Sequence, residues 1–101
     1  MASLQVRYRP AAVDELSDAV DWYASQNPTA AGEFCEIIER KLLEASSSLH
    51  RWPLQPDGTR QILLGKFPYV LIVCEHRGAL EVLAVAHASR EPGYWRDRLD
   101  E

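Results

Sequence analysis

The sequence predicts an α+β fold with an N-terminal strand, a helical hairpin and a three-stranded antiparallel meander. Two observations carry this prediction. Through the first half of the chain, apolar residues recur every three or four positions, which is typical of amphipathic helices. In the second half, short apolar runs are separated by glycine or proline, which is typical of strands joined by turns. The chain has 101 residues, enough for a single core, so we expect one domain over residues 1–101.

The first half contains one expected strand and two expected helices. Residues 4–8 alternate apolar and polar side chains, and Pro10 ends this strand and can open a helix. The apolar stripe of that helix is Val13, Leu16, Ala19 or Val20, and Tyr23, with Asp14, Glu15, Asp18 and Asp21 expected on the opposite side. Asn27-Pro28 joins an N-cap residue to a proline at the first helical position, which predicts the start of a second helix. Its stripe is Phe34, Ile38, Leu42, Ala45 and Leu49.

Three strands are expected next, over residues 59–64, 69–75 and 80–87, with Arg77-Gly78 as a two-residue turn. If His76 faces Ala79 across this turn, Ile72 lies opposite Leu83 and Val70 opposite Val85. The other face would carry Tyr69, Leu71, Val73, Leu80, Val82, Ala84 and Ala86, because side chains alternate along a strand.

Both faces of the expected meander are therefore apolar, and one helical hairpin can cover only one of them. Ala84 and Ala86 suit close approach by a helix, so their face is the one that we expect to be covered. The other face would be left bare, and an uncovered apolar patch on a small monomer usually marks a binding surface. The residues expected there are Val70, Ile72, Leu83 and Val85.

Charge and composition exclude several functional classes. The formal net charge is −4, with a strongly acidic first half and a mildly basic second half. Proteins that grip nucleic acid normally carry a basic footprint, so we expect direct nucleic-acid binding to be weak or absent. No apolar run approaches the length of a membrane span, and residues 1–10 lack the pattern of a signal peptide, so we expect a cytoplasmic protein without membrane attachment. Cys35 and Cys74 show no metal-ligand or redox spacing, and we expect no metal and no cofactor.

Polar residues that could carry chemistry gather at the end of the last strand. His87, Arg90 and Tyr94 could converge with Arg60 from the first strand of the meander. Metal-free RNA cleavage needs a base, an acid and cations around the phosphate, and these residue types could supply them. The alternative is structural: His87 ends a strand, Arg90 pairs with a carboxylate, and Tyr94 and Trp95 pack the tail onto the core.

Several short motifs resemble the toxins of the RelE/ParE superfamily of type II toxin–antitoxin modules. They are Phe67-Pro68-Tyr69 at a strand start, the segment from His87 to Trp95 with Arg90, Pro92 and Tyr94 within it, Trp22-Tyr23 in the first helix and Ala30-Ala31 in the second. The resemblance spans nearly the whole chain and is closest to the ParE branch. It implies a toxin held inactive by a cognate antitoxin in a hetero-oligomer.

The resemblance also separates two modes of action. RelE-type ribosome-dependent ribonucleases carry lysines on the strand that matches residues 59–64, where this chain has Gln61, Ile62 and Leu63. They also carry two arginines, where this chain has Val70 and Ala88. Losing a cation beside the scissile phosphate costs about 10²-fold or more in rate. ParE-type toxins lack that set and are associated with poisoning of DNA gyrase by protein binding.

We therefore expect a toxin that inhibits growth through gyrase or another macromolecular target. Trp95, Arg96 and Arg98 are the expected target anchors, because Trp and Arg dominate many protein interfaces. The alternatives are an mRNA endoribonuclease using His87, Arg90 and Tyr94, and a degenerate toxin that only binds its antitoxin. An adjacent reading frame for a DNA-binding antitoxin would be the most informative observation.

Overall fold

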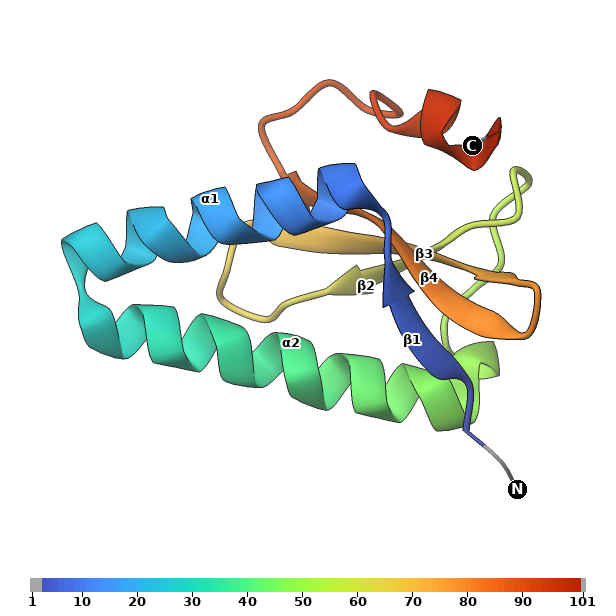
Figure 1. Ribbon diagram of the computed structural model, residues 1–101, viewed down its shortest axis with the longest axis horizontal. Coiled ribbons are helices and arrows are strands. Elements are labelled where there is room, and N and C mark those ends of the chain that lie inside the picture. Colours follow the sequence, from blue (N-terminus) through green and yellow to red (C-terminus); the bar gives the residue numbers. More distant parts are fainter. Residues whose placement is uncertain (1–2, 101) are drawn as a thin grey trace.

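The computed structural model describes residues 3–100 and confirms the predicted α+β fold (Figure 1). A short strand precedes two helices, and three strands and a C-terminal tail follow. In chain order the elements are β1 (Gln5–Tyr8), α1 (Pro10–Gln26), α2 (Pro28–Ser48), a 3₁₀ turn η1 (Leu49–Arg51), β2 (Arg60–Leu63), β3 (Tyr69–His76), β4 (Ala79–His87) and a second 3₁₀ segment η2 (Arg96–Asp100). Neither helix in this part of the chain has the length and apolar character needed to cross a membrane.

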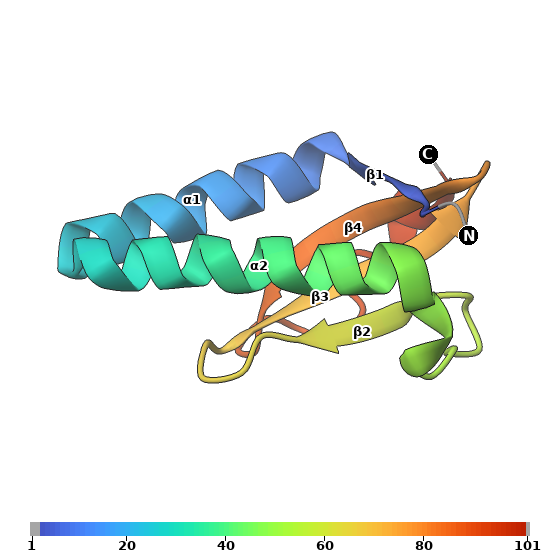
Figure 2. The same cartoon turned by 90° about the horizontal axis from the view of Figure 1, so that it is seen from below.

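The sheet is mixed, with strand order β1-β4-β3-β2. The meander β2-β3-β4 is antiparallel, as predicted, whereas β1 pairs with β4 in parallel. A parallel pair needs a long crossover, and the helical hairpin supplies it. Figure 2 shows α1 and α2 side by side over the same side of the sheet, so the crossover also covers one sheet face.

The helical hairpin turns at Asn27, as the sequence predicted. The Asn27 backbone is extended, and its side-chain oxygen accepts a hydrogen bond from the Thr29 amide at 3.0 Å. Pro28 follows at the start of α2, where a missing N–H costs nothing. The junction is therefore both the end of one helix and the cap of the next, which keeps the hairpin tight.

The main core lies between the helices and the sheet. The predicted α2 stripe of Phe34, Ile38, Leu42, Ala45 and Leu49 is buried throughout. At the hairpin end of this core, the Phe34 ring lies 5.1 Å from Tyr23, 5.2 Å from Phe67 and 5.2 Å from Tyr69, measured between ring centroids. Aromatic rings from three separate segments thus share one cluster, which fixes the hairpin on the sheet.

A β-bulge changes the register that the sequence predicted. Arg77 and Gly78 form the expected turn, with φ of 52° and 76°, and His76 faces Ala79. After Val73↔Val82 the register shifts, so Ile72 pairs with Ala84 and Val70 with Ala86. The predicted pairs Ile72–Leu83 and Val70–Val85 are wrong, because β4 carries one extra residue at this point.

The bulge also reverses which side chains face the helices beyond it. Val85 packs in the main core with the helices, whereas Ala84 and Ala86 belong to a second cluster on the opposite face. The prediction that Ala84 and Ala86 face the helices, and that Val85 faces away, is therefore wrong. Inserting one residue exchanges the two faces of a strand for every later position.

The opposite face of the sheet is covered by the C-terminal tail. Trp95, which is 5% exposed, packs there with Ile72, Cys74 and Leu83. Tyr94 and Leu99 pack against the same cluster. The expectation of a bare apolar face is wrong, because the last residues of the chain supply a second, smaller core.

Candidate functional site

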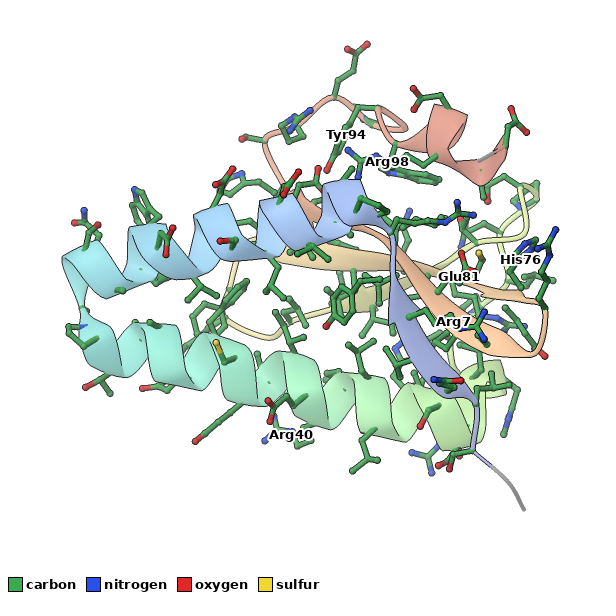
Figure 3. The ribbon with its side chains drawn as sticks, viewed as in Figure 1. Arg7, Arg40, His76, Glu81, Tyr94 and Arg98 are labelled. Carbon is green, nitrogen blue, oxygen red and sulfur yellow. The ribbon has the colours of Figure 1, made fainter. Side chains whose placement is uncertain are left out.

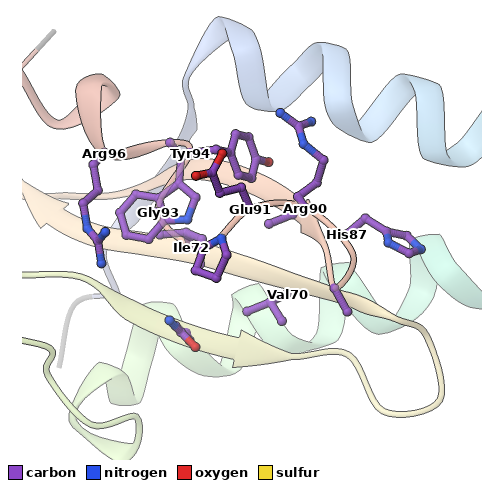
Figure 4. Close-up of a pocket in the computed structure, with 13 residues that line it drawn as sticks. Val70, Ile72, His87, Arg90, Glu91, Gly93, Tyr94 and Arg96 are labelled. Carbon is purple, nitrogen blue, oxygen red and sulfur yellow. The ribbon is translucent and has the colours of Figure 1, made fainter.

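A groove remains open between the C-terminal tail and the sheet (Figure 4). Its volume is about 240 Å³. One wall is the tail, and the floor is formed by β3 with the ends of β2 and β4. The lining residues are Gln61, Val70, Ile72, Ala86, His87, Ala88, Arg90, Glu91, Pro92, Gly93, Tyr94, Trp95 and Arg96. The groove therefore contains three of the four residues predicted as candidates for chemistry.

His87, Arg90 and Tyr94 border this groove, whereas Arg60 is directed elsewhere. The Arg60 guanidinium donates to the Trp52 carbonyl oxygen at 2.6 Å. It thereby ties the loop after α2 to the start of β2. The predicted convergence of Arg60 with the other three side chains is wrong, and Arg60 has a structural contact instead.

Tyr94 has its hydroxyl directed out of the groove and into a buried carboxylate. The hydroxyl donates to Glu15 at 2.6 Å, and the Arg90 guanidinium carbon lies 3.8 Å from the Tyr94 ring centroid. Burial raises the pKa of Tyr94, and the hydrogen bond to Glu15 and its negative charge raise it further, to about 12. The phenol therefore stays protonated at neutral pH and is unsuited to act as a general base.

Glu15 is the centre of this arrangement and joins α1 to both the tail and the sheet. Its carboxylate accepts two hydrogen bonds from Arg98, at 2.9 and 3.1 Å, and one from the Val85 amide at 3.0 Å. Arg98 also donates to the Leu83 carbonyl oxygen at 2.9 Å. Figure 3 shows Tyr94 and Arg98 directed toward the N-terminal half of α1. We call Glu15, Tyr94 and Arg98 the tail clasp.

The clasp is electrostatically favourable in its ionised form. Burial pushes the pKa of Glu15 upward, but hydrogen bonds from Arg98, Tyr94 and Val85 outweigh burial and hold it below its ordinary value of 4.5. The hydrogen bond to Glu15 raises the pKa of Arg98. Both members are therefore charged near neutrality, and their bidentate pairing is the geometry that guanidinium and carboxylate prefer.

The sequence reasoning missed Glu15, which it placed on the solvent side of α1. A signal was present: Glu15 lies three residues after Ala12 and four before Ala19, and both alanines are buried. Residues three and four apart share a helix face, so Glu15 borders the buried stripe. A carboxylate at such a position requires a partner, and the tail provides Arg98 and Tyr94.

His87 is held at the end of β4 by local contacts. Its Nδ1 accepts the Ser89 backbone amide at 3.0 Å and lies 2.7 Å from the Ser89 hydroxyl oxygen. The imidazole packs edge to face on Tyr69, with 4.9 Å between ring centroids. These contacts occupy the Nδ1 atom of His87 and pack its ring on Tyr69.

The residues predicted to bind the antitoxin occupy different environments. Val70 is half-buried and Ile72 is 3% exposed, and both line the groove. Leu83 is fully buried beneath the tail, and Val85 is 2% exposed among the residues facing the helices. The expectation that all four are uncovered is wrong, and only Val70 and Ile72 lie at the groove.

The predicted target anchors are also mostly engaged within the chain. Trp95 is buried in the second core, and Arg98 belongs to the tail clasp. The Arg96 side chain is 63% exposed, and its Nε lies 3.6 Å from the Asp57 carboxylate. The expectation that all three present a free surface is wrong, and Arg96 alone of the three does so. Among residues 3–100 no group of three or more potential ligands could hold a metal ion.

Comparison with known proteins agrees with this architecture. The sequence profile described as "ParE toxin of type II toxin-antitoxin system, parDE" matches residues 6–92. A solved chain from "Chromosomal ParDE TA system from P. aeruginosa" superposes with a TM-score of 0.70 at 15% identity, covering 84% of this chain and 96% of that one. Comparison with curated protein sequences gave no match. With the profile matching most of its length, the chain belongs to the ParE toxin family of type II toxin–antitoxin systems, whose partner is an antitoxin.

Proposed function

We propose that this toxin inhibits growth by binding DNA gyrase in the cytoplasm, without catalysing a reaction itself, and that the antitoxin neutralises it in a hetero-oligomer. One observation carries the non-catalytic part of the proposal. The Tyr94 hydroxyl, one of the predicted candidates for acid–base chemistry, donates to Glu15 at 2.6 Å and has a pKa of about 12. The residue that would have to exchange a proton with RNA is thus committed to holding the tail.

The electrostatics of the groove support the same conclusion. Val70 and Ala88 lie at the groove, where the cleaving branch of the superfamily carries arginines. Arg90 is present, but its guanidinium stacks on the Tyr94 ring at 3.8 Å. A scissile phosphate needs cations that contact its oxygens in the transition state, and this groove offers a sparse set. The net charge of −4 also disfavours approach of a polyanion.

The groove is better suited to a protein segment. Its floor is apolar at Val70 and Ile72, and two charged residues, Arg90 and Glu91, lie at its rim. An apolar floor with a polar rim is the usual anatomy of a protein interface. We assign antitoxin contact to Val70 and Ile72, which line the groove, and we exclude Leu83 and Val85, which do not. For the target, Arg96 offers an exposed cation, while Trp95 and Arg98 hold the tail that presents it.

Purified toxin tests the proposal in two parallel assays. The first follows gyrase supercoiling and the accumulation of cleaved DNA, and the second follows mRNA on translating ribosomes. We expect loss of supercoiling with intact mRNA, and we expect His87→Ala to retain gyrase inhibition, since the imidazole is engaged in contacts with Ser89 and Tyr69 of the same chain.

The alternative is a ribonuclease, favoured by the shared position of His87, Arg90 and Tyr94 at one groove. Cleavage of ribosome-bound mRNA that His87→Ala abolishes would establish it and would contradict the gyrase proposal. Inactivity in both assays, with antitoxin binding intact, would instead indicate a degenerate toxin that only binds its partner.

A further inference from the structure

A second hollow lies at the hairpin end of the molecule, outside the groove beneath the tail. Its volume is about 450 Å³, and Trp22, Tyr23, Pro68, Tyr69 and His87 line it. We call it the aromatic pocket. It brings together three motifs that are far apart in sequence: Trp22-Tyr23 from α1, Pro68-Tyr69 from the start of β3, and His87 from the end of β4. None of these rings takes part in the tail clasp.

The pocket walls are rigid and already assembled. The Trp22 and Tyr23 rings lie edge to face with 5.1 Å between centroids, and Tyr23 and Tyr69 are 6.2 Å apart. Behind them, Tyr23 packs on Phe34 at 5.1 Å and on Phe67 at 5.3 Å. Burial raises the pKa of both Tyr23 and Tyr69, so the phenols stay uncharged. A pocket supported by the main core loses little entropy when it is filled.

Trp22 distinguishes this hollow from ordinary core packing. Its side chain is 57% exposed, although it stands beside a well-packed aromatic cluster. Tryptophan is strongly enriched among dominant interface contacts, and this one leaves more than half of its side chain in contact with solvent. Leu43 on α2 is also exposed, at 70%, but it does not line the aromatic pocket. The two positions therefore form a matched pair for a test.

The charges around the pocket select the chemistry of its occupant. All charged residues of α1 are acidic; Asp18 precedes Trp22 by one helical turn, and Asp21 is its neighbour. Neither aspartate has an ion-pair partner among residues 3–100. His87 also lines the pocket, and its Nδ1 accepts the Ser89 amide at 3.0 Å. Aromatic faces next to unpaired carboxylates favour a cation.

Two nearby cations are already engaged. Lys66 contacts the Glu33 carboxylate on α2, and Arg90 stacks on the Tyr94 ring. Neither one fills the aromatic pocket, because neither is among its lining residues. Asp18 and Asp21 therefore place two carboxylates on α1 close to Trp22 in sequence, and neither of these cations is paired with them.

We propose that the aromatic pocket receives a lysine or arginine side chain of the antitoxin. His87 lines both this pocket and the groove beneath the tail, so one continuous segment can occupy both hollows. The inference rests on the antitoxin contact proposed for the groove and adds a second, cationic anchor to it. The cation would contact the Trp22 ring and be attracted to Asp18 at the same time. Binding would displace water from the rings, which strengthens the attraction between the charges.

Titration calorimetry of toxin variants with the cognate antitoxin tests the inference. Trp22→Ala should weaken binding by about tenfold or more, as expected for an interface tryptophan. Leu43→Ala, the matched control, should bind like the wild type. Both substituted residues are exposed, so circular dichroism should show an unchanged fold. Equal affinities for wild type and Trp22→Ala would overturn the inference.

Two further substitutions identify the chemistry of the occupant. Trp22→Phe keeps an aromatic face and should retain most of the affinity, whereas Trp22→Leu keeps only apolar bulk and should bind as weakly as Trp22→Ala. Asp18→Asn should weaken binding at low salt and have a smaller effect at high salt, because salt screens exposed charges. Full affinity with Trp22→Leu would mean an aliphatic occupant and would overturn the proposal of a cation.

The result can also be separated from the other proposals. Val70→Asp alters the groove alone. If Val70→Asp loses antitoxin binding and Trp22→Ala does not, the proposed groove contact is supported and the inference about the aromatic pocket is overturned. Trp22→Ala that binds antitoxin normally but fails to inhibit gyrase would place the pocket in target recognition and would overturn the inference.

Discussion

Removing the Glu15 carboxylate should loosen the whole C-terminal tail. In the folded chain this carboxylate accepts hydrogen bonds from Tyr94, the Val85 amide and both terminal nitrogens of Arg98. The side chains of Glu15 and Arg98 are 16% and 14% exposed, so water cannot replace these contacts freely. Glu15→Ala leaves the guanidinium and the phenol without their acceptor beside an apolar cluster.

The expected cost follows from the kind of contact that is lost. Breaking one partner of a buried ion pair costs about 3 to 5 kcal/mol, and leaving a neutral polar group unsatisfied costs about 1 to 3 kcal/mol. Because the clasp keeps some contact with solvent, we expect about 2 to 4 kcal/mol for Glu15→Ala. Glu15→Gln retains the shape and one acceptor oxygen, so its effect should be smaller. Urea unfolding followed by tryptophan fluorescence measures both values, with Trp95 reporting on the tail.

The pH dependence gives the same prediction a second test. The pKa of Glu15 is lowered in the folded state, so its stabilisation is fully present above the ordinary value of 4.5. It is lost as the pH falls through the folded value. The difference in unfolding free energy between wild type and Glu15→Ala should therefore be largest near pH 7 and shrink in acid. A difference below about 0.5 kcal/mol at pH 7, or one that does not depend on pH, would refute the role given to the clasp.

Three other substitutions probe the fold. Phe34→Ala removes the fully buried ring that contacts Tyr23, Phe67 and Tyr69, and should cost about 3 to 5 kcal/mol in denaturant melts; a shift below about 1 kcal/mol would be incompatible with its place in the core. Asn27→Ala removes the side-chain acceptor of the Thr29 amide and should cost about 1 kcal/mol by the same measurement. An unchanged free energy of unfolding would contradict the role of this cap. Gly93→Ala introduces a side chain at φ 78° and against the Arg96 guanidinium, and should cost about 1 to 2 kcal/mol in thermal unfolding. Adding Arg96→Ala should remove the clash with the guanidinium but not the backbone strain.

The sequence was sufficient for the elements that depend on local signals. Asn27-Pro28 marked the hairpin because capping and proline placement act within one turn, and Arg77-Gly78 marked the β3-β4 turn because two consecutive residues there need positive φ. The stripe from Phe34 to Leu49 followed from helical periodicity. Each of these signals is complete within a few residues.

The errors concern relations between segments rather than patterns within one segment. The bulge opposite Ile72 and Val73 adds one residue to β4 without a glycine or proline to mark it, and it reversed the assignment of Val85, Ala84 and Ala86. The tail returns to cover the second sheet face through contacts between Glu15 and Arg98, which are 83 positions apart. No local pattern encodes such a contact, although the place of Glu15 beside a buried stripe shows that it needs a partner.

The corrections change how the functional residues are interpreted. Trp95 and Arg98, expected at a target surface, hold the tail in place, and Tyr94 has the same structural role. Arg96, the groove and the aromatic pocket are exposed features to which we assign contacts with partners. Under the proposed function, the toxin would act through surfaces of this kind, by shape and charge.

The most direct test of action by binding is the stoichiometry of gyrase inhibition. Supercoiling is measured at fixed gyrase concentration while purified toxin is titrated from far below to above that concentration. A toxin that acts by occupying gyrase should inhibit in proportion to the toxin-to-gyrase ratio, reach completion only near or above equimolar amounts, and be reversed by added antitoxin. Complete and lasting inhibition at strongly substoichiometric toxin would show turnover and would contradict the account.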